Sequence, residues 1–356
     1  MCSHSGIYRY RRAAVLVFIL TMVAAPGLAQ PASQDTAEIE RRGRALTRQF
    51  LAGSADSLVG ELSDSFVQQK GGREGVRSWV REEREWLGGP DVPAEAARSP
   101  GQIVEERAYL TGGEAYYCQV RNLPGDSTTL DERKVLRWRW GTTETKAVTG
   151  AFMNTATTAD LPQKSQKEST TVLRLPVEGR WYVNWGGDHA CENYHVSYGQ
   201  SFAYDLTVRQ NGRAYHGDGT ENSDYYCYGR SVVAPASGRV VVARDTIPDN
   251  ETPFSIDNRL SNQVALAHGS GEYSILTHLR PNSVTVEVGE RVERGQKIGE
   301  CGNSGSSQFP HLDYSLVTDP DPREGKGLPA PFVDYEANGE LIERGTPVRG
   351  EYESPQ

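Results

Sequence analysis

The chain has 356 residues, with 38 basic and 47 acidic side chains and a formal net charge of −9. An acidic chain has little electrostatic attraction for nucleic acid or anionic lipid, so no nucleic-acid partner is expected. The length is enough for two domains of ordinary size.

The first 29 residues have the pattern of a secretory signal. Three arginines precede an apolar run over residues 13–25, and the small residues Gly27 and Ala29 precede the predicted cut. The apolar run is shorter than the ~20 residues that span a bilayer, and no later segment comes near that length. We therefore expect an exported protein, periplasmic or extracellular, without an integral membrane segment in the mature chain.

Four cysteines remain after the predicted cut: Cys118, Cys191, Cys227 and Cys301. An even number in an oxidising compartment indicates one or two disulfides. Spacing alone does not rank the three connectivities, and Cys227 with Cys301 is the pairing we expect first. A zinc cluster is disfavoured because no two of these cysteines lie two to four residues apart.

Residues 35–154 are predicted to form a small α+β domain. Apolar residues recur at helical steps over residues 35–87, and from residue 103 onward four stretches alternate with a period of two between turn signals. Helices followed by an antiparallel meander resemble the cystatin-like or NTF2-like domains of exported bacterial proteins. Without a catalytic motif, packing or ligand recognition is the expected role.

The second half of the chain is predicted to be all-β. A polar stretch over residues 155–170 is the predicted linker. Short β-branched runs alternate with Gly, Pro and Asn turns over residues 171–317. The tail, residues 318–356, is rich in Pro, Gly and Glu, and we expect it to wrap the surface or to be partly disordered.

Three histidines of this half stand in short motifs, and a fourth motif supplies a carboxylate. The motifs are Asn193-Tyr194-His195, Phe202-Ala203-Tyr204-Asp205, Thr277-His278-Leu279 and Pro310-His311-Leu312-Asp313. A zinc hydrolase needs three protein ligands from such residue types and leaves a fourth position for water. It also needs a base and a group that stabilises the oxyanion.

Several ordered segments between residues 200 and 316 resemble the lysostaphin-type (LytM-like, duplicated hybrid motif) peptidoglycan zinc metallopeptidases. They are residues 233–241, 268–269, 273–279, 288–292, 295–299, 302–305 and 310–312. The resemblance implies a domain of antiparallel sheets with a barrel-sandwich-like architecture. It also implies a bound Zn²⁺ and peptidoglycan peptides as the substrate.

The family pattern is His-x-x-x-Asp, a strand histidine and His-x-His, in which the first His, the Asp and the last His bind zinc. The resemblance makes Asp205 the zinc aspartate, and it makes His278 and His311 the catalytic pair that acts on water and the tetrahedral intermediate. Two positions depart from the pattern, because Ser201 stands where the first ligand is expected and Asp313 stands where the last histidine is expected.

His195 and Asp313 are the candidates for the two missing ligands, which gives the metal set His195, Asp205 and Asp313. Residues 311 and 313 are two apart on a predicted strand and so point to one face, and Asp binds Zn²⁺ at roughly 2.0–2.2 Å. A second carboxylate brings the complex to zero charge. It therefore weakens the pull that lowers the pKa of bound water toward ~7.

Two functions follow. The first is a zinc metalloendopeptidase that acts on peptidoglycan peptides in cell-wall remodelling. The alternative is an inactive pseudo-peptidase that has lost the metal and binds wall peptides or activates a partner hydrolase. Trp185 and the tyrosines at 225, 226 and 228 are candidates for a groove that takes sugar or peptide, although such aromatics also serve packing.

Overall fold

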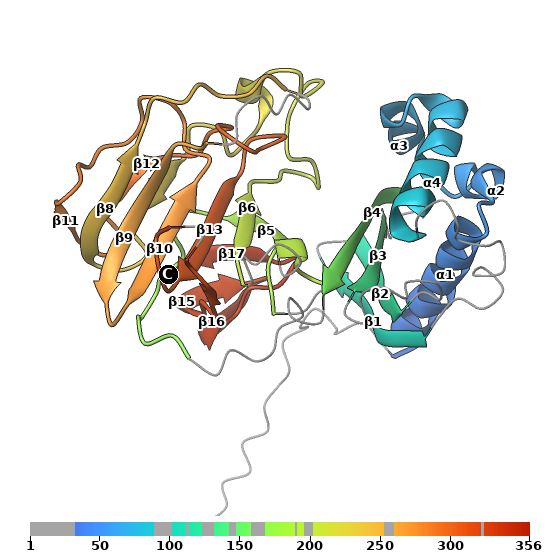
Figure 1. The fold of residues 1–356 in the computed structure, drawn as a ribbon, viewed down its shortest axis with the longest axis horizontal. Coiled ribbons are helices and arrows are strands. Elements are labelled where there is room, and N and C mark those ends of the chain that lie inside the picture. Colours follow the sequence, from blue (N-terminus) through green and yellow to red (C-terminus); the bar gives the residue numbers. More distant parts are fainter. Residues whose placement is uncertain are drawn as a thin grey trace, which may run out of the picture.

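The computed structural model describes residues 33–88, 102–111, 114–122, 132–141, 147–157, 168–188, 191–195, 202–252, 260–321 and 324–356. The predicted signal, residues 1–29, lies outside them, as do residues 158–167 of the predicted linker. Figure 1 shows a helical layer with a small sheet beside a larger β domain. No helix in these ranges is long and apolar enough to cross a membrane.

The first domain is four helices on one face of an antiparallel sheet with strand order β1-β2-β3-β4. Its elements are α1 (Ser33–Leu51), α2 (Ala55–Val59), α3 (Asp64–Gln69), α4 (Gly72–Gly88), β1 (Gln102–Thr111), β2 (Glu114–Asn122), β3 (Glu132–Gly141) and β4 (Val148–Thr157). The ring of Phe50 lies 5.6 Å from Trp79 and 5.9 Å from Trp138 in the core between the layers. Helices followed by a meander confirm the predicted element order, and the likeness to cystatin or NTF2 domains stays a prediction.

The alternation of side chains along each strand decides which residues lie on the other face of this sheet. Tyr117 and Trp138 point to the helices, so Tyr116, Cys118, Arg137 and Arg139 point away from them. In the β2–β3 register Cys118 lies opposite Arg137, and Tyr116 lies opposite Arg139. This second face meets the β domain, where the Tyr116 hydroxyl hydrogen-bonds the Tyr182 hydroxyl.

The second domain is built on an antiparallel sheet with the order β11-β8-β9-β10-β13-β6-β5-β17-β15-β16, with β14 beside β13 and a separate β12-β7 pair. The strands are β5 (Trp181–Trp185), β6 (Tyr204–Thr207), β7 (Ser231–Val233), β8 (Gly238–Arg244), β9 (Gln263–Gly269), β10 (Glu272–Thr277), β11 (Arg291–Val292), β12 (Lys297–Glu300), β13 (Leu312–Val317), β14 (Gly327–Leu328), β15 (Phe332–Ala337), β16 (Glu340–Gly345) and β17 (Tyr352–Pro355). The predicted all-β class is confirmed.

The tail differs from the expected surface wrap, because β14 to β17 all come from residues 318–356. β17 pairs with β5 and so continues the main sheet. Phe332 is fully buried, with its ring 5.2 Å from Tyr204 and 5.4 Å from Tyr314. These strands are short and partly exposed, so their composition resembles that of a loop although a few of their residues are buried in the core.

The structure pairs Cys118 with Cys191 at a Cα–Cα distance of 5.5 Å, across the two domains. Cys227 and Cys301 are buried thiols, so the predicted Cys227–Cys301 disulfide is wrong. The Cys227 thiol instead donates to the carbonyl of Pro310 and accepts from the Thr207 hydroxyl. The true partners are 73 residues apart in different domains, and no local pattern in the sequence marks such a pair.

Glu353 on β17 makes stability depend on pH. Its carboxyl is 1% exposed, and burial, followed by the neighbouring Glu351, raises its pKa from 4.5 to about 9. The folded protein therefore keeps a proton that the unfolded chain releases above pH 4.5. The free energy of unfolding should fall as pH rises between these values, by at most about 1.4 kcal/mol per pH unit.

We expect Glu353→Gln to flatten this fall and to be more stable than the wild type at pH 8. Urea unfolding at pH 5 and pH 8 measures the difference, with Glu340→Gln as the control at an exposed position of β16. A Glu353→Gln variant that loses as much stability as the wild type between the two pH values would contradict the assignment.

Candidate metal centre

Two aspartates face one another on neighbouring strands at the centre of the second domain. Asp205 on β6 and Asp313 on β13 are direct cross-strand partners, so their side chains project from the same side of the sheet. The side chains are only 7% and 13% exposed. Like charges directly opposite one another are destabilising, so this pair requires a proton or a cation between its carboxylates.

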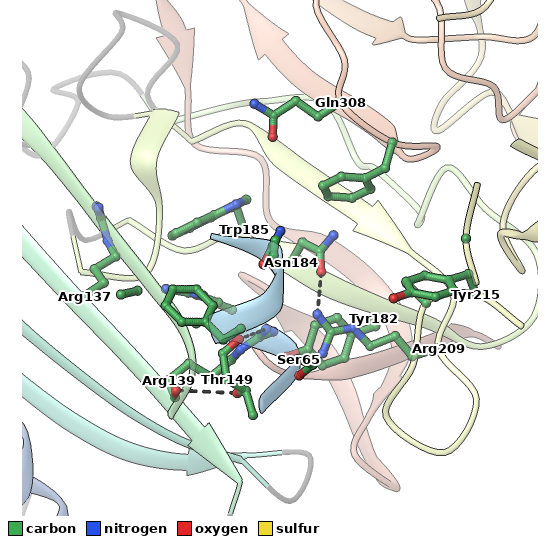
Figure 2. Close-up of a pocket in the computed structure, with 18 of the residues that line it drawn as sticks. Ser65, Arg137, Arg139, Thr149, Tyr182, Asn184, Trp185, Arg209, Tyr215 and Gln308 are labelled. Atoms are coloured by element: carbon green, nitrogen blue, oxygen red, sulfur yellow. Dashed lines mark hydrogen bonds between the residues drawn. The ribbon is translucent and has the colours of Figure 1, made fainter. Parts of the chain in front are cut away.

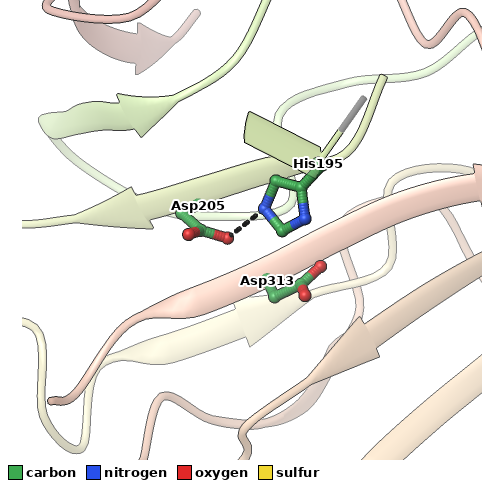
Figure 3. Close-up of side chains that lie close together, drawn as sticks. All are labelled: His195, Asp205 and Asp313. Atoms are coloured by element: carbon green, nitrogen blue, oxygen red, sulfur yellow. Dashed lines mark hydrogen bonds and ion pairs between the residues drawn. The ribbon is translucent and has the colours of Figure 1, made fainter. Parts of the chain in front are cut away.

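His195 reaches the pair from the loop that precedes β6. Its Nε2 lies 2.8 Å from Asp205 Oδ1, and the neighbouring Tyr194 hydroxyl donates to Asp205 Oδ2 at 3.4 Å. Figure 3 shows the imidazole beside both carboxylates. Asn193 holds the turn, since its side-chain amide donates to the carbonyls of Gly187 and Ala203 and its Oδ1 accepts from the backbone N–H of His195.

His278 and His311 enter the same site from the ends of two strands. His278 follows β10, and its Nδ1 lies 2.7 Å from the Ser304 carbonyl. His311 precedes β13, and its Nδ1 lies 2.8 Å from the Phe309 carbonyl. A carbonyl only accepts, so in both rings Nδ1 carries the hydrogen, and in the neutral ring Nε2 offers its lone pair.

The two Nε2 atoms point at the aspartates. His278 Nε2 is 4.0 Å from Asp313 Oδ2, His311 Nε2 is 3.8 Å from Asp205 Oδ1, and the two ring centroids are 4.7 Å apart. His278 has a positive φ of 62°, which a non-glycine residue adopts at a cost of roughly 1–3 kcal/mol. The backbone is thus held in a strained conformation at the residue that directs a ring into the site.

Gly302 shows why a glycine-rich loop supports His278. The Gly302 N–H donates to the His278 carbonyl at 3.0 Å, and a Cβ on this residue would lie 2.4 Å from backbone atoms of Arg280. Any side chain would push the two segments apart. The predicted Gly-Asn-Ser-Gly motif therefore lets the Ser304 carbonyl approach the His278 ring.

Charge and burial shift the pKa values of the two aspartates in opposite directions and lower that of His278. Burial alone would raise the pKa of Asp205, but His195 and His311 outweigh it and the pKa falls to about 2. Burial raises the pKa of Asp313 to about 6, to which the charge of Asp205 adds. Burial, followed by the charge of His311, lowers the pKa of His278 to about 3, so this ring is neutral near pH 7.

The residues present fit a divalent cation. One ligand atom from each of His195, Asp205 and Asp313 lies within 4.8 Å of the others. Ligands of a tetrahedral zinc at about 2.0–2.1 Å lie roughly 3.3 Å apart, so small side-chain rotations would bring these three to bonding distance. All five site residues predicted from the sequence therefore meet in one place.

An anchor from the first domain to the His195 turn was not predicted. Cys191 in this turn is bonded to Cys118 of β2, and its carbonyl accepts from Arg137 Nε at 3.2 Å. The next residue, Glu192, forms an ion pair with Arg107 of β1 at 3.3 Å. The one signal in the sequence is that Cys191 stands four residues before His195.

Part of the chain is similar in sequence to known peptidases. The family model described as Peptidase family M23 matches residues 223–324, which include His278, His311 and Asp313. The peptidoglycan DD-endopeptidase ShyA of Vibrio cholerae serotype O1 is 39% identical over 56 residues, 16% of this chain. The match spans only 13% of the length of that relative.

Two solved structures are similar at low sequence identity. The catalytic domain of lysostaphin from Staphylococcus simulans is 19% identical, with 42% of this chain and 88% of that chain covered and a TM-score of 0.25. A zinc-containing peptidase from Vibrio cholerae is 14% identical, with 52% and 53% covered and a TM-score of 0.27. The family match over residues 223–324 confirms the resemblance to lysostaphin-type peptidases.

Proposed function

We propose, from the premise that the C-terminal half of this chain carries a domain of peptidase family M23, that the protein is a zinc-dependent endopeptidase acting on peptidoglycan peptides. Two nearly buried aspartates opposite one another, with a histidine nitrogen 2.8 Å from one of them, support a cation site most strongly. The substrate class follows the family and the name of the Vibrio cholerae relative.

His195, Asp205 and Asp313 would hold the zinc. When bound, the ion supplies Lewis-acid polarisation of the scissile carbonyl and lowers the pKa of a water molecule. The Nδ1 hydrogen of His278 is bonded to the Ser304 carbonyl, so its Nε2 lone pair faces the site and is placed to accept a proton from water. A protonated Nε2 of His278 or His311 then donates a hydrogen bond to the developing oxyanion or a proton to the leaving amine.

Export to the periplasm or the cell exterior is part of the proposal. The signal pattern over residues 1–29 supports it. The disulfide between Cys118 and Cys191 supports it as well, because such bonds persist in oxidising compartments. Cell-wall peptides are within reach of a protein in either location.

A pseudo-peptidase is the second candidate, and Asp313 is the observation that favours it. With two carboxylates the zinc site is neutral, which weakens the acidification of water compared with a His-His-Asp set. The same fold without a metal would bind wall peptides or activate a partner hydrolase.

The experiment is to measure zinc content and hydrolysis of purified peptidoglycan by the mature protein. We expect about one zinc per chain and release of new amino groups from the wall. Loss of a general acid or base lowers the reaction rate roughly 10²–10⁴-fold, so we expect the rate of wall hydrolysis by His311→Ala to fall by that factor. His216→Ala is the matched control, since this histidine is 61% exposed and outside the site.

Absence of hydrolysis by the zinc-loaded wild type would contradict the proposed endopeptidase activity. In that case Asp313→His tells the two remaining cases apart. Hydrolysis gained by the variant would show a peptidase scaffold that lost its activity through this one ligand, and no gain would favour a binding role.

A further inference from the structure

A cleft between the two domains opens beside the metal centre. Its cavity measures about 550 Å³, within the usual range for ligand sites. One wall comes from the first domain, with Arg137 and Arg139 of β3 and residues of α3 and β4, and the other is β5 and the loops of the second domain (Figure 2). Neither domain forms this cleft alone.

The cleft is cationic although the chain is acidic. Of the described residues that line it, four are arginines and one is an acid: Arg137, Arg139, Arg209, Arg349 and Asp218. Asp218 is at the rim and caps its own loop by accepting from the Thr220 hydroxyl and N–H. Arg137, Arg139 and Arg209 also donate to the Cys191 carbonyl, the Thr149 carbonyl and Asn184 Oδ1. These acceptors are neutral, so the excess of positive charge among the described lining residues favours an anion.

Three of these guanidinium groups lie over aromatic rings. Arg209 lies 3.8 Å above the Tyr182 ring, and Arg349 lies 3.9 Å above the Trp185 ring. Arg137 from the first domain also lies over Trp185, at 5.2 Å. A stacked guanidinium keeps its N–H donors in its own plane, in the fork geometry that binds a carboxylate in bidentate fashion.

The cleft reaches the metal centre on two sides. Phe309 lines it, and the Phe309 carbonyl accepts from His311 Nδ1 while its ring lies 5.3 Å from the His311 ring. Trp185 lines the other side and packs 5.0 Å from the ring of Tyr194, whose hydroxyl donates to Asp205. Phe309 and Trp185 thus place the cleft one side chain away from the metal centre, within reach of an extended peptide bound there.

We propose that this interdomain cleft binds a carboxylate-bearing segment of the peptide substrate, so that the first domain acts as a recognition wall for the second. The inference rests on the proposed function, because the ligand is taken to be the extension of the chain cut at the metal centre. An acidic peptide is favoured over a phosphate polymer because the cleft lies beside the proposed peptidase site and half of its described lining residues carry aromatic or amide side chains.

The test is calorimetric binding in the presence of a chelator, so that neither metal nor hydrolysis is needed. The probes are the acidic tetrapeptide Ala-Glu-Glu-Ala with a free C-terminus, its fully amidated Gln counterpart, and inorganic polyphosphate. We expect the acidic peptide to bind at least about tenfold more tightly than the amide, which is the effect of one good charge-assisted contact. The double variant Arg139→Gln/Arg349→Gln should remove this preference.

Arg239→Gln, at an exposed position of β8 far from the cleft, is the matched control and should keep the preference. Thermal melts of all variants check that they fold. Equal binding of the acidic and amidated peptides, an unchanged preference in the double variant, or stronger binding of polyphosphate would each overturn the proposal. If the protein hydrolyses the wall but binds both peptides equally, the proposed role of the cleft is wrong and the proposed activity stands. If it prefers the acidic peptide but does not hydrolyse the wall, the proposed activity is wrong and the role of the cleft stands.

Discussion

Asp205→Asn should lower the affinity for zinc by on the order of a hundredfold or more. The amide keeps the shape of the side chain but removes the one carboxylate that contacts both His195 and His311. Substitution of a residue that only supports a metal ligand lowers metal affinity by 10–100-fold, and substitution of a charged ligand itself should lower it more. Titration of the metal-free protein with zinc against a competing chelator measures the loss.

The variant should also lose the stabilisation that zinc gives to the folded state. A ligand at a thousand times its Kd stabilises by about 4 kcal/mol, which is visible as a shift of the melting temperature. Asp334→Asn, at an exposed position of β15, should keep the shift. If Asp205→Asn binds zinc as tightly as the wild type, Asp205 is not a ligand.

Cys118→Ser should lower both the free energy of unfolding and the affinity for zinc. The disulfide closes a loop of 73 residues, for which chain entropy alone predicts a stabilisation of about 4 kcal/mol. The same bond fixes Cys191 four residues before His195, and we expect its loss to lower zinc affinity by roughly 10–100-fold, as for other supports of metal ligands. Urea unfolding and zinc titration measure the two effects separately.

Reduction provides the matched control for this variant. Among the described cysteines only Cys118 and Cys191 are bonded, so reduction with a water-soluble phosphine, which binds zinc far more weakly than a dithiol does, should reproduce both effects in the wild type and change little in Cys118→Ser. Glu192→Gln, which removes the ion pair to Arg107, should give a smaller loss of zinc affinity in the same direction. An unchanged zinc affinity after loss of the bond would mean that the disulfide serves stability alone.

All five residues of the site were predicted from the sequence, by the period of a strand or by motifs of the family resemblance. Residues 311 and 313 are two apart, and the period of a strand was enough to place both on one face. His278 and the Gly302 loop were found through ordered motifs of the family resemblance. In the first domain the period of two located all four strands to within a few residues, because each has one face toward the helices.

The sequence did not predict how distant segments hold these residues in place. His195 stands in an irregular turn whose position is fixed by Asn193 and by a disulfide to another domain, and neither leaves a periodic pattern. The strands of the tail are short, and a few apolar residues, among them Leu328, Phe332 and Tyr335, bring them into the core. The cleft requires the placement of two domains, which no single stretch of sequence encodes.

We propose that two carboxylates and one imidazole hold the ion, with Asp313 in the place of a histidine. A crystal structure of the zinc-loaded protein, with the ion located by its anomalous scattering at the zinc edge, tests this most directly. We predict an ion within roughly 2.0–2.2 Å of a nitrogen of His195 and of one oxygen each from Asp205 and Asp313. An ion bound elsewhere, or one to which Asp313 contributes no oxygen, would contradict it.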